Sequence, residues 1–316
     1  MMRRTIGVAA AALCAGALTA AAADYTIMAP AAPGGGWDQT ARTMQTLMQK
    51  EGISGNVQVM NVPGAGGTIG LAQFVNQAKG NPEALIVGGY VMVGAILTNQ
   101  SPVDLSMVTP IARLTGEQEA IVVPAASDIQ TMADLVAKLK ADPGSVSWGG
   151  GSAGGADHIL AGLIAKASGV DPTKVNYIAF SGGGEALAAI LGGQVTVGVS
   201  GLGEFESQIE AGQLRLLAVS GEERIEGIDA PTLKEAGVDA ALENWRMVAG
   251  GPDLTPEQVA AITADIEKLA TSEAWKTELA TRGWDDRFLA GEAFQAQLAA
   301  DIEQTRGILK DIGLVQ

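Results

Sequence analysis

The sequence is poor in the side chains that most enzymes and metal proteins use for chemistry. Its 316 residues include a single cysteine, Cys14, and a single histidine, His158. Zinc sites are usually built from several cysteine and histidine ligands, so this composition excludes the ordinary zinc centre. The sequence also lacks a Gly-Lys-Ser or Gly-Lys-Thr phosphate-binding motif. We therefore expect no metal ion, no cofactor and no nucleoside triphosphate site.

Positive charge is also scarce. The chain has 20 lysine and arginine residues against 35 aspartate and glutamate residues, which gives a formal net charge of -15. Such an acidic protein is a poor partner for nucleic acid or for an anionic membrane surface. Aromatic residues make up only 4% of the chain, so aliphatic side chains must form most of the core. No apolar run after the N-terminal segment reaches the length needed to span a bilayer.

The N-terminal 23 residues have the pattern of a secretory signal peptide. Arg3 and Arg4 supply the positive start, residues 6–18 form an apolar stretch too short to span a bilayer, and three alanines end the segment. We expect cleavage after Ala23 and a periplasmic mature protein. Cys14 lies within this segment, and the residues before it do not fit a lipoprotein signal. The mature chain therefore has no cysteine and no disulfide.

Short apolar segments alternate with glycine-rich loops and helical patterns along the rest of the chain. Five times a strand pattern runs into a glycine-rich loop that opens a helix. The five loops occupy residues 33–38, 63–68, 149–155, 181–184 and 200–203. This alternation predicts an α/β fold with mostly parallel sheets and helices on both faces. Ligands of such folds bind at the carboxyl ends of the strands, where these loops lie.

The composition of the loops suits the binding of an anion. Glycine lets the backbone approach a ligand closely, and the first turn of each helix offers unpaired N–H groups and a partial positive charge. Several converging helix starts would hold a carboxylate even in an acidic protein. The alternative is that the glycines serve only as turns and tight contacts between helices and strands. Trp37 lies inside the first loop and is a candidate for a pocket wall.

One loop resembles the active-site turn of a hydrolase. Residues 150–154 read Gly-Gly-Ser-Ala-Gly, which matches the Gly-x-Ser-x-Gly elbow between a strand and a helix. A hydrolase needs an acid and then a histidine well downstream, whereas His158 lies six positions after Ser152 on the same predicted helix. A secreted serine hydrolase using Ser152 is therefore the weaker alternative, and Ser152 is better explained as a hydrogen-bond donor to a ligand. His158 either faces that ligand or packs its own helix.

Taken together, the loop sequences resemble one family, the tripartite tricarboxylate transporter receptors, also called the Bug family. Residues 32–42 read Ala-Pro-Gly-Gly-Gly-Trp-Asp-Gln-Thr-Ala-Arg, and residues 61–70 read Asn-Val-Pro-Gly-Ala-Gly-Gly-Thr-Ile-Gly. All the stretches that resemble the family are residues 29–42, 61–70, 151–158, 167–171, 191–195, 211–219 and 231–237. As a set they follow the family's order along essentially the whole mature chain.

The resemblance implies a two-lobed periplasmic binding protein of the type II, or Venus-flytrap, kind, and not an enzyme. Residues 24–119 together with 247–316 would form lobe 1, and residues 120–246 lobe 2. A small organic carboxylate would bind in the cleft between the lobes, which would close around it. The closed receptor, which we expect to be a monomer, would then dock on the membrane subunits of a tripartite tricarboxylate transporter. Presentation of the ligand to a membrane sensor kinase is an alternative that the sequence does not separate from transport.

Carried over position by position, the resemblance implies ligand contacts from both lobes. The implied residues are Gly35, Gly36, Trp37, Asp38, Gly67, Thr68, Ser152, His158, Ser181, Gly182, Gly183, Gly201 and Glu204. Tyr90 is added because it follows a predicted strand. The Trp-Asp-Gln-Thr stretch that begins at Trp37 resembles the tricarboxylate branch of the family, which favours a tricarboxylate such as citrate.

Overall fold

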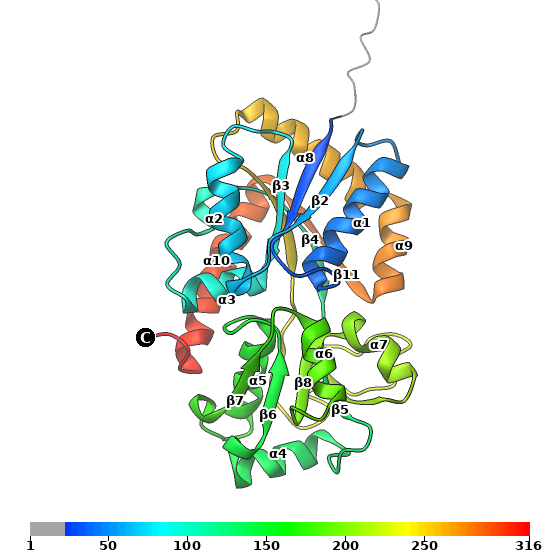
Figure 1. Ribbon diagram of the computed structural model, residues 1–316, viewed down its shortest axis with the longest axis vertical. Helices are drawn as coiled ribbons and strands as arrows, with labels where there is room; N and C mark the ends of the chain where they lie inside the picture. Colours follow the sequence, from blue (N-terminus) through cyan, green and yellow to red (C-terminus); the bar gives the residue numbers. More distant parts are fainter. Residues whose placement is uncertain (1–22) are drawn as a thin grey trace, which may run out of the picture.

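A computed structural model of the chain describes residues 23–316 and shows two lobes, one above the other in Figure 1. Each lobe has a β-sheet at its centre and helices packed around it. The prediction of a two-lobed α/β fold is confirmed. The predicted signal peptide falls on residues 1–22 and Ala23, so almost all of it lies outside the described part of the chain. None of the helices within residues 23–316 is long and apolar enough to cross a membrane.

The upper sheet has six strands in the order β11-β4-β10-β3-β1-β2. The strands are β1 (Tyr25–Ala29), β2 (Val57–Asn61), β3 (Ala84–Gly89), β4 (Thr109–Glu117), β10 (Arg246–Gly250) and β11 (Trp284–Ala290). β1 pairs in parallel with β2 and β3. β10 pairs antiparallel with β3 and β4, and β11 pairs antiparallel with β4.

The lower sheet has five strands in the order β7-β6-β8-β5-β9. The strands are β5 (Glu119–Pro124), β6 (Ser147–Gly150), β7 (Asn176–Ala179), β8 (Val197–Gly201) and β9 (Leu214–Val219). β6 pairs in parallel with β7 and β8, whereas β5 pairs antiparallel with β8 and β9.

The pairing corrects the expectation of mostly parallel sheets, because both sheets are mixed. Strands that follow the strand–loop–helix pattern pair in parallel, as β1, β2 and β3 do. The strands that enter a sheet from the junction of the lobes, β5 in the lower sheet and β10 in the upper sheet, run opposite to these parallel strands. A sequence pattern shows that a helix separates two strands, but it does not show which sheet receives the next strand.

Two adjacent chain segments join the lobes. Only Gln118 separates the end of β4 from the start of β5, so the chain passes directly from the upper sheet to the lower one. It returns through the segment between β9 and β10. There the backbone N–H of Glu117 donates to the carbonyl of Asn244 at 3.1 Å, and the N–H of Asn244 donates to the carbonyl of Glu117 at 2.9 Å. The two crossings are therefore fastened to each other at the hinge.

Helices cover both faces of each sheet (Figure 1). Their bounds are α1 (Gly36–Lys50), α2 (Thr68–Gln77), α3 (Tyr90–Thr98), α4 (Met132–Ala141), α5 (Ala156–Ala167), α6 (Gly183–Leu191), α7 (Leu202–Glu210), α8 (Pro256–Thr271), α9 (Glu273–Arg282) and α10 (Gly291–Asp311). In the upper lobe α1, α8 and α9 lie on one side, and α2, α3 and α10 lie on the other. Because several helices begin directly after a strand, their N-termini gather where the lobes meet.

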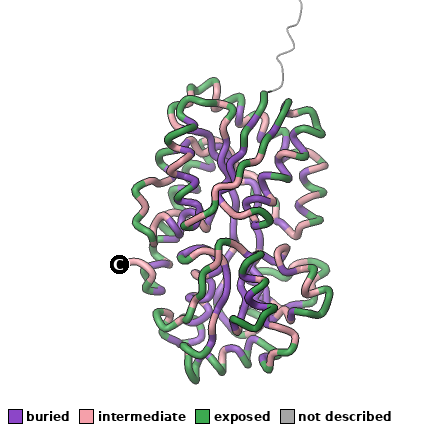
Figure 2. Tube along the Cα trace, viewed as in Figure 1, coloured by how far each residue is buried: buried purple, intermediate pink, exposed green. Residues whose placement is uncertain are grey.

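Buried residues run through the middle of both lobes and across their junction (Figure 2). One hydrophobic cluster includes Trp275 of the upper lobe and Trp148 of the lower lobe, both fully buried. The end of α10 reaches down to the lower lobe, where Lys166 Nζ lies 2.8 Å from Asp311 Oδ2. Just after it, Ile312 packs so closely on Gly162 of α5 that an added Cβ there would lie 3.0 Å away.

Candidate ligand-binding cleft

A cleft of about 370 Å³ lies between the lobes at the starts of the helices. All five predicted glycine-rich loops, or the helices that follow them, contribute to it. The lining consists of Pro30, Ala31, Gly35, Gly36, Trp37, residues 64–67, Val91, residues 151–153, Asp157, residues 179–183, Glu185, Ser200, Glu204, Asn244 and Arg246. A larger cavity of about 950 Å³ lies elsewhere, beside Tyr90, Trp245 and the acidic segment 222–226. The smaller cleft is the better candidate because helix starts from both lobes converge on it.

The structure brings together most of the residues that the resemblance implies. The lining of the cleft includes Gly35, Gly36, Trp37, Gly67, Ser152, Ser181, Gly182, Gly183 and Glu204. The lining does not include Asp38, Thr68, Tyr90, His158 or Gly201. These five lie in or beside the same loops and hinge, and the contacts that each of them makes there are described below.

The first-lobe wall consists of backbone and one indole ring. Gly36 begins α1, and an added Cβ there would collide with the guanidinium of Arg246. Gly67 has a φ of +88°, in the left-handed region that favours glycine, and an added Cβ would lie 2.7 Å from the ring of Trp37. The absence of a side chain at Gly36 leaves room for Arg246, and its absence at Gly67 leaves room for Trp37, which is only 7% exposed and lies in the wall of the cleft.

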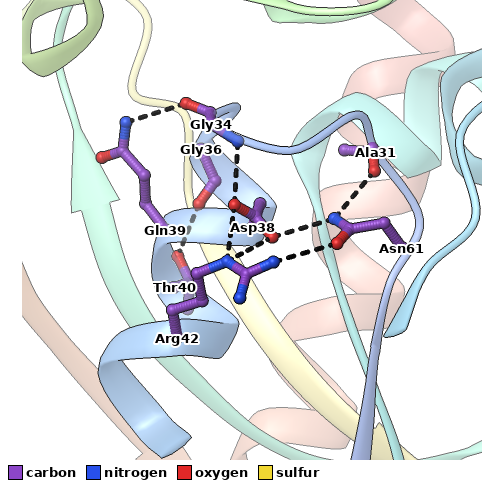
Figure 3. Close-up of polar contacts among 8 residues, drawn as sticks. All are labelled: Ala31, Gly34, Gly36, Asp38, Gln39, Thr40, Arg42 and Asn61. Carbon is purple, nitrogen blue, oxygen red and sulfur yellow. Dashed lines mark hydrogen bonds and ion pairs between the residues drawn. The ribbon is translucent and has the colours of Figure 1, made fainter. Parts of the chain in front are cut away.

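Asp38 is not part of the lining of the cleft; its side chain points toward Gly34, Arg42 and Asn61 and fixes the loop that forms the wall (Figure 3). Its carboxylate accepts hydrogen bonds from the N–H of Gly34 at 2.8 Å, from Arg42 Nε at 2.9 Å and from Asn61 Nδ2 at 2.9 Å. Burial alone would raise the pKa of Asp38, but the bonds from Arg42, Gly34 and Asn61 outweigh it and hold this pKa below its usual range. Asp38 is therefore ionised and positions the start of α1.

The loop before α5 forms one part of the second-lobe wall. Asp157, in the first turn of α5, accepts a hydrogen bond from the N–H of Gly151 at 2.5 Å. Tyr177 Oη donates to the carbonyl of the same glycine at 2.8 Å. These two bonds hold Gly151 and Ser152 at the edge of the cleft. The carboxyl of Asp157 is itself part of the lining.

Glu204 forms the other part of the second-lobe wall. Its Oε2 accepts a hydrogen bond from Ser200 Oγ at 2.5 Å. The carboxyl lies against Gly183 at the start of α6, where an added Cβ would be 2.5 Å from it. Its Oε1 would also lie 3.9 Å from a Cβ on Gly35 of the other lobe. Glu204 thus reaches the place where the two lobes come together.

Thr68 and Gly201 hold the fold beside the cleft instead of lining it. Thr68 Oγ1 donates to the carbonyl of Ala65 at 2.9 Å and closes the turn before α2. Gly201 lies against the carboxyl of Glu117, which leaves no room for a side chain. Tyr90 lines the larger cavity and makes an edge-to-face contact with Trp245, with ring centroids 6.4 Å apart.

His158 packs its own helix, which is one of the two explanations that the sequence left open. Its ring stacks on Tyr177 with centroids 4.2 Å apart, and its Nδ1 accepts a hydrogen bond from the N–H of Gly154 at 3.1 Å. Burial lowers the pKa of His158 to about 4, so the imidazole is neutral near pH 7. Within residues 23–316 no hydrogen bond joins His158 to Ser152. The pair does not have the geometry of a nucleophile and its general base.

Arg246 is the main cleft residue that the sequence analysis missed. It begins β10, is 2% exposed and forms an ion pair with Glu117. Its guanidinium also lies over the ring of Trp284, 5.0 Å from the ring centroid. One terminal nitrogen, Nη1, has no hydrogen-bond partner within residues 23–316. A lone arginine inside the apolar stretch Trp-Arg-Met-Val-Ala was the available signal, since a cation in a buried strand needs a partner.

Four carboxyl groups surround this arginine: Glu117, Glu119, Asp157 and Glu204. Burial, together with the repulsion of Glu117, raises the pKa of Glu204 to about 7 and that of Asp157 to about 6. Burial and the neighbouring acids also raise the pKa of Glu119 above its usual range; its carboxyl is fully buried and has no hydrogen-bond partner within residues 23–316. In the described part of the chain no cluster of acidic or histidine side chains is arranged to hold a metal ion.

Two lobes joined by two crossings, with a cleft walled by helix starts, define the class of two-lobed periplasmic binding proteins. Within this class the chain belongs to the tripartite tricarboxylate transporter receptor family. Residues 40–314 match the family model described as "Tripartite tricarboxylate transporter family receptor". The resemblance recognised in the loop sequences is therefore confirmed, and the fold and family are those of substrate-binding receptors.

Individual proteins agree with this assignment. An Agrobacterium vitis protein described as "UPF0065 protein in the TAR-I ttuE-ttuC' intergenic region" is 31% identical over 260 residues, which cover 80% of this chain and 70% of the relative. The periplasmic binding protein BugD superposes with a TM-score of 0.82 at 21% identity and covers 92% of this chain and 98% of its own. MatC from Rhodopseudomonas palustris with bound malate has a TM-score of 0.77 at 23% identity, with coverage of 92% and 98%. At these identities the two structures show a shared fold.

Proposed function

We propose that this protein is an exported receptor that closes two lobes around a small organic carboxylate and delivers it to the membrane subunits of a tripartite tricarboxylate transporter. The observation that carries the proposal is the convergence of helix starts from both lobes on one cleft that also contains Arg246. Unpaired N–H groups at helix starts and the guanidinium of a lining arginine are donors suited to a carboxylate. The malate bound by MatC, which has the same fold, supports this class of ligand.

Export and lobe division are parts of the same proposal. The signal peptide of residues 1–23 is removed after Ala23, and the mature chain works in the periplasm as a monomer. Lobe 1 comprises residues 24–119 and 247–316, and lobe 2 residues 120–246. The sheets support this division to within one residue at each crossing, because β5 to β9 form one sheet from Glu119 onward and β10 joins the other sheet at Arg246.

Binding shifts a hinge equilibrium between open and closed arrangements. The lobes already meet across the cleft: Val91 of α3 lies against Gly155, and an added Cβ on Gly66 would be 3.5 Å from Cβ of Ser152. A ligand that contacts both walls stabilises this closed arrangement relative to an open one. The membrane subunits then recognise the surface that closure creates.

The proposal is tested with the mature chain from Asp24, unfolded in denaturant and refolded to remove any bound ligand. A thermal-shift screen would cover citrate, malate and other di- and tricarboxylates, amino acids and aromatic acids. A ligand that binds only the native state raises the melting temperature. Citrate is included because the sequence around Trp37 favours a tricarboxylate. If no carboxylate raises the melting temperature of the refolded protein, the proposed function is wrong.

Trp37→Ala is expected to weaken the binding of the best carboxylate by tenfold or more, about 1.4 kcal/mol, because it removes the indole wall. Isothermal titration calorimetry would measure this loss. Trp37→Phe keeps an aromatic wall and should recover most of the affinity. Melting curves of the unliganded variants separate loss of binding from loss of folding. Equal affinities for all three proteins would remove Trp37 from the site.

A further inference from the structure

The junction of the lobes brings together carboxyl groups that belong to opposite sides of the hinge. Glu117 ends β4 and Arg246 begins β10, so both belong to the upper sheet, and they form an ion pair with each other. Glu119, Asp157 and Glu204 belong to the lower lobe. The acids of the lower lobe therefore meet an upper-lobe pair whose charges already balance.

The upper lobe covers the two lower-lobe acids that line the cleft. Asp157 lies in the first turn of α5, and Val91 of α3 packs against Gly155 directly before that turn, where an added Cβ would lie 3.0 Å from it. Glu204 Oε1 would lie 3.9 Å from a Cβ on Gly35, beside the start of α1. In the closed arrangement, upper-lobe elements thus help to keep bulk water from both carboxyls. A hinge motion that separates the lobes would remove this cover.

The cost of burial depends on the charge of the carboxyl, because an ionised group loses far more hydration than a neutral one. Burial, followed by the repulsion of Glu117, raises the pKa of Glu204 to about 7. Burial likewise raises the pKa of Asp157 to about 6. Since burial is the largest cause for both, and part of it comes from the opposite lobe, both pKa values should fall toward their ordinary range when the lobes separate. The closed arrangement therefore binds protons that the open one releases.

We propose that the hinge is a pH-sensitive switch, in which protonation of Asp157 and Glu204 favours the closed arrangement and their ionisation favours an open one. The switch acts on the hinge without a ligand. It rests on the opening and closing motion of the proposed function and adds protons as a second influence on that equilibrium.

Other charged or titratable groups surround the two acids, but separation of the lobes acts mainly on Asp157 and Glu204. The surrounding groups are Glu117 of β4, Glu119 of β5, His158 of α5, Tyr177 of β7, Glu185 of α6, Arg246 of β10 and Arg282 of α9. His158 has a pKa of about 4, and burial raises the pKa of Tyr177 well above its ordinary value, so both stay neutral between pH 5 and pH 8. Glu119 is fully buried and does not line the cleft, so opening does not bring it to the surface.

The direction of the pH effect follows from proton binding. A carboxyl whose pKa is raised by closure favours the closed arrangement at low pH. This contribution is lost as the pH rises from about 4, the ordinary value, to about 6 for Asp157 and about 7 for Glu204. Within that window the ratio of closed to open molecules should fall by up to about tenfold per pH unit for each group.

The experiment measures the distance between the lobes in the ligand-free protein. The chain from Asp24 contains no cysteine, so two introduced cysteines can be labelled with a fluorescent donor and acceptor. Asn76→Cys on α2 and Ala188→Cys on α6 place the labels on exposed positions of the two lobes. In the refolded protein, energy transfer should fall as the pH rises from 5 to 8. Labels at Asn76→Cys and Gln49→Cys, both in the upper lobe, control for effects of pH on the dyes and should show no change.

Variants assign the response to the two acids. Glu204→Gln with Asp157→Asn removes both titrating groups, so energy transfer at pH 8 should stay at its level at pH 5. Each single variant should keep part of the response, which makes the result independent of how well the double variant folds. Glu210→Gln is the matched control, because Glu210 is an exposed residue at the end of α7. It should respond to pH as the natural chain does.

The outcomes separate the switch from the proposed function. Energy transfer between the lobes that stays constant or rises from pH 5 to pH 8 overturns the switch. A full response in the double variant overturns its assignment to Asp157 and Glu204. Because these measurements use no ligand, the receptor function is decided separately by the thermal-shift screen. A carboxylate that raises the melting temperature of a protein without the pH response leaves the receptor function standing.

Discussion

The two walls of the cleft are built in different ways. The first-lobe wall presents Gly35, Gly36, Gly67 and the Trp37 indole, and its acid, Asp38, is turned away into the loop. The second-lobe wall presents the carboxyls of Asp157 and Glu204. A wall of backbone and indole recognises shape and one negative group, whereas a wall of acids responds to the charge of the rest of the ligand. Under the proposed function, we expect affinity for a carboxylate to depend mainly on the first lobe and selectivity among carboxylates mainly on the second.

Replacing Arg246, which lies between the two walls, should have the largest effect on the free energy of unfolding. Arg246→Met leaves Glu117 buried without its partner, and breaking a buried ion pair from one side costs about 3–5 kcal/mol. Urea unfolding should show a loss of free energy of unfolding of this size. The double variant Arg246→Met with Glu117→Gln should recover part of it.

The matched control is Arg224→Met, which breaks the half-exposed pair between Arg224 and Glu235. Surface pairs contribute about 1 kcal/mol or less, so this variant should be nearly as stable as the natural chain. If the two single variants lose the same stability, the pair at Arg246 contributes no more than a surface contact.

The carboxyl groups of the second-lobe wall should make the unliganded protein less stable as the pH rises. Glu204 and Asp157 have pKa values raised to about 7 and about 6, so between pH 5 and pH 7 the folded protein binds more protons than the unfolded chain. The free energy of unfolding must fall across this window. A pKa raised from 4.5 to about 7 corresponds to about 3 kcal/mol for Glu204 alone.

Urea unfolding at pH 5 and at pH 8 would measure this dependence. Glu204→Gln should flatten it, because glutamine does not titrate and the remaining acids lose a repelling neighbour. A stability that rises between pH 5 and pH 8 in the natural chain, with no change in the variant, would contradict the arrangement of the second-lobe wall.

The first-lobe wall should not tolerate an added methyl group at Gly67. Gly67→Ala places a Cβ 2.7 Å from the Trp37 ring in a backbone with φ of +88°. Steric overlap and backbone strain together should cost about 1–3 kcal/mol and weaken carboxylate binding. Gly52→Ala is the control, since Gly52 has a φ of +65° and open space around it, so it reports the backbone strain alone. Thermal unfolding and calorimetry of both variants would show whether the indole contact matters.

Asp38→Asn should have the smallest effect on stability. It tests whether the first lobe affects the affinity for carboxylates without affecting the selectivity among them. The substitution weakens the hydrogen bonds to Gly34, Arg42 and Asn61 (Figure 3) and should cost about 1 kcal/mol. Carboxylates of every kind should bind a few-fold more weakly because the start of α1 is less fixed. The ratio of affinities for aspartate and malate should not change. A changed ratio would mean that the first lobe also contributes to selectivity.

The parts of the site that the sequence predicted are those encoded by neighbouring residues. A strand, a glycine-rich loop and a helix start follow one another along the chain, so Gly35, Gly36, Trp37 and Gly67 could be identified from local pattern. The orientation of Asp38 could not, because an acid in the first turn of a helix can equally face a ligand or cap its own loop. His158 posed the same problem, and its contact with Tyr177 decided it.

Long-range pairing explains what was missed. Glu117 and Arg246 are 129 positions apart and meet only because β4 and β10 are neighbours in a mixed sheet. Alternating strands and helices predicted parallel pairing and gave no sign of these antiparallel strands. The hinge therefore contains features that local patterns do not encode. These are a buried arginine, the acids around it, and the side-chain oxygen of Asn244, which has no donor within residues 23–316.

The last turn of the chain also joins the two lobes. α10 packs beside α3 in the upper lobe, yet Asp311 and Ile312 are fastened to Lys166 and Gly162 below. Any hinge motion that separates the lobes must either move this segment with the lower lobe or break its contacts with Lys166 and Gly162. A fusion placed after Gln316 would lie beside these contacts between the lobes and would strain them. One placed before Asp24, at the far end of β1, would lie away from them.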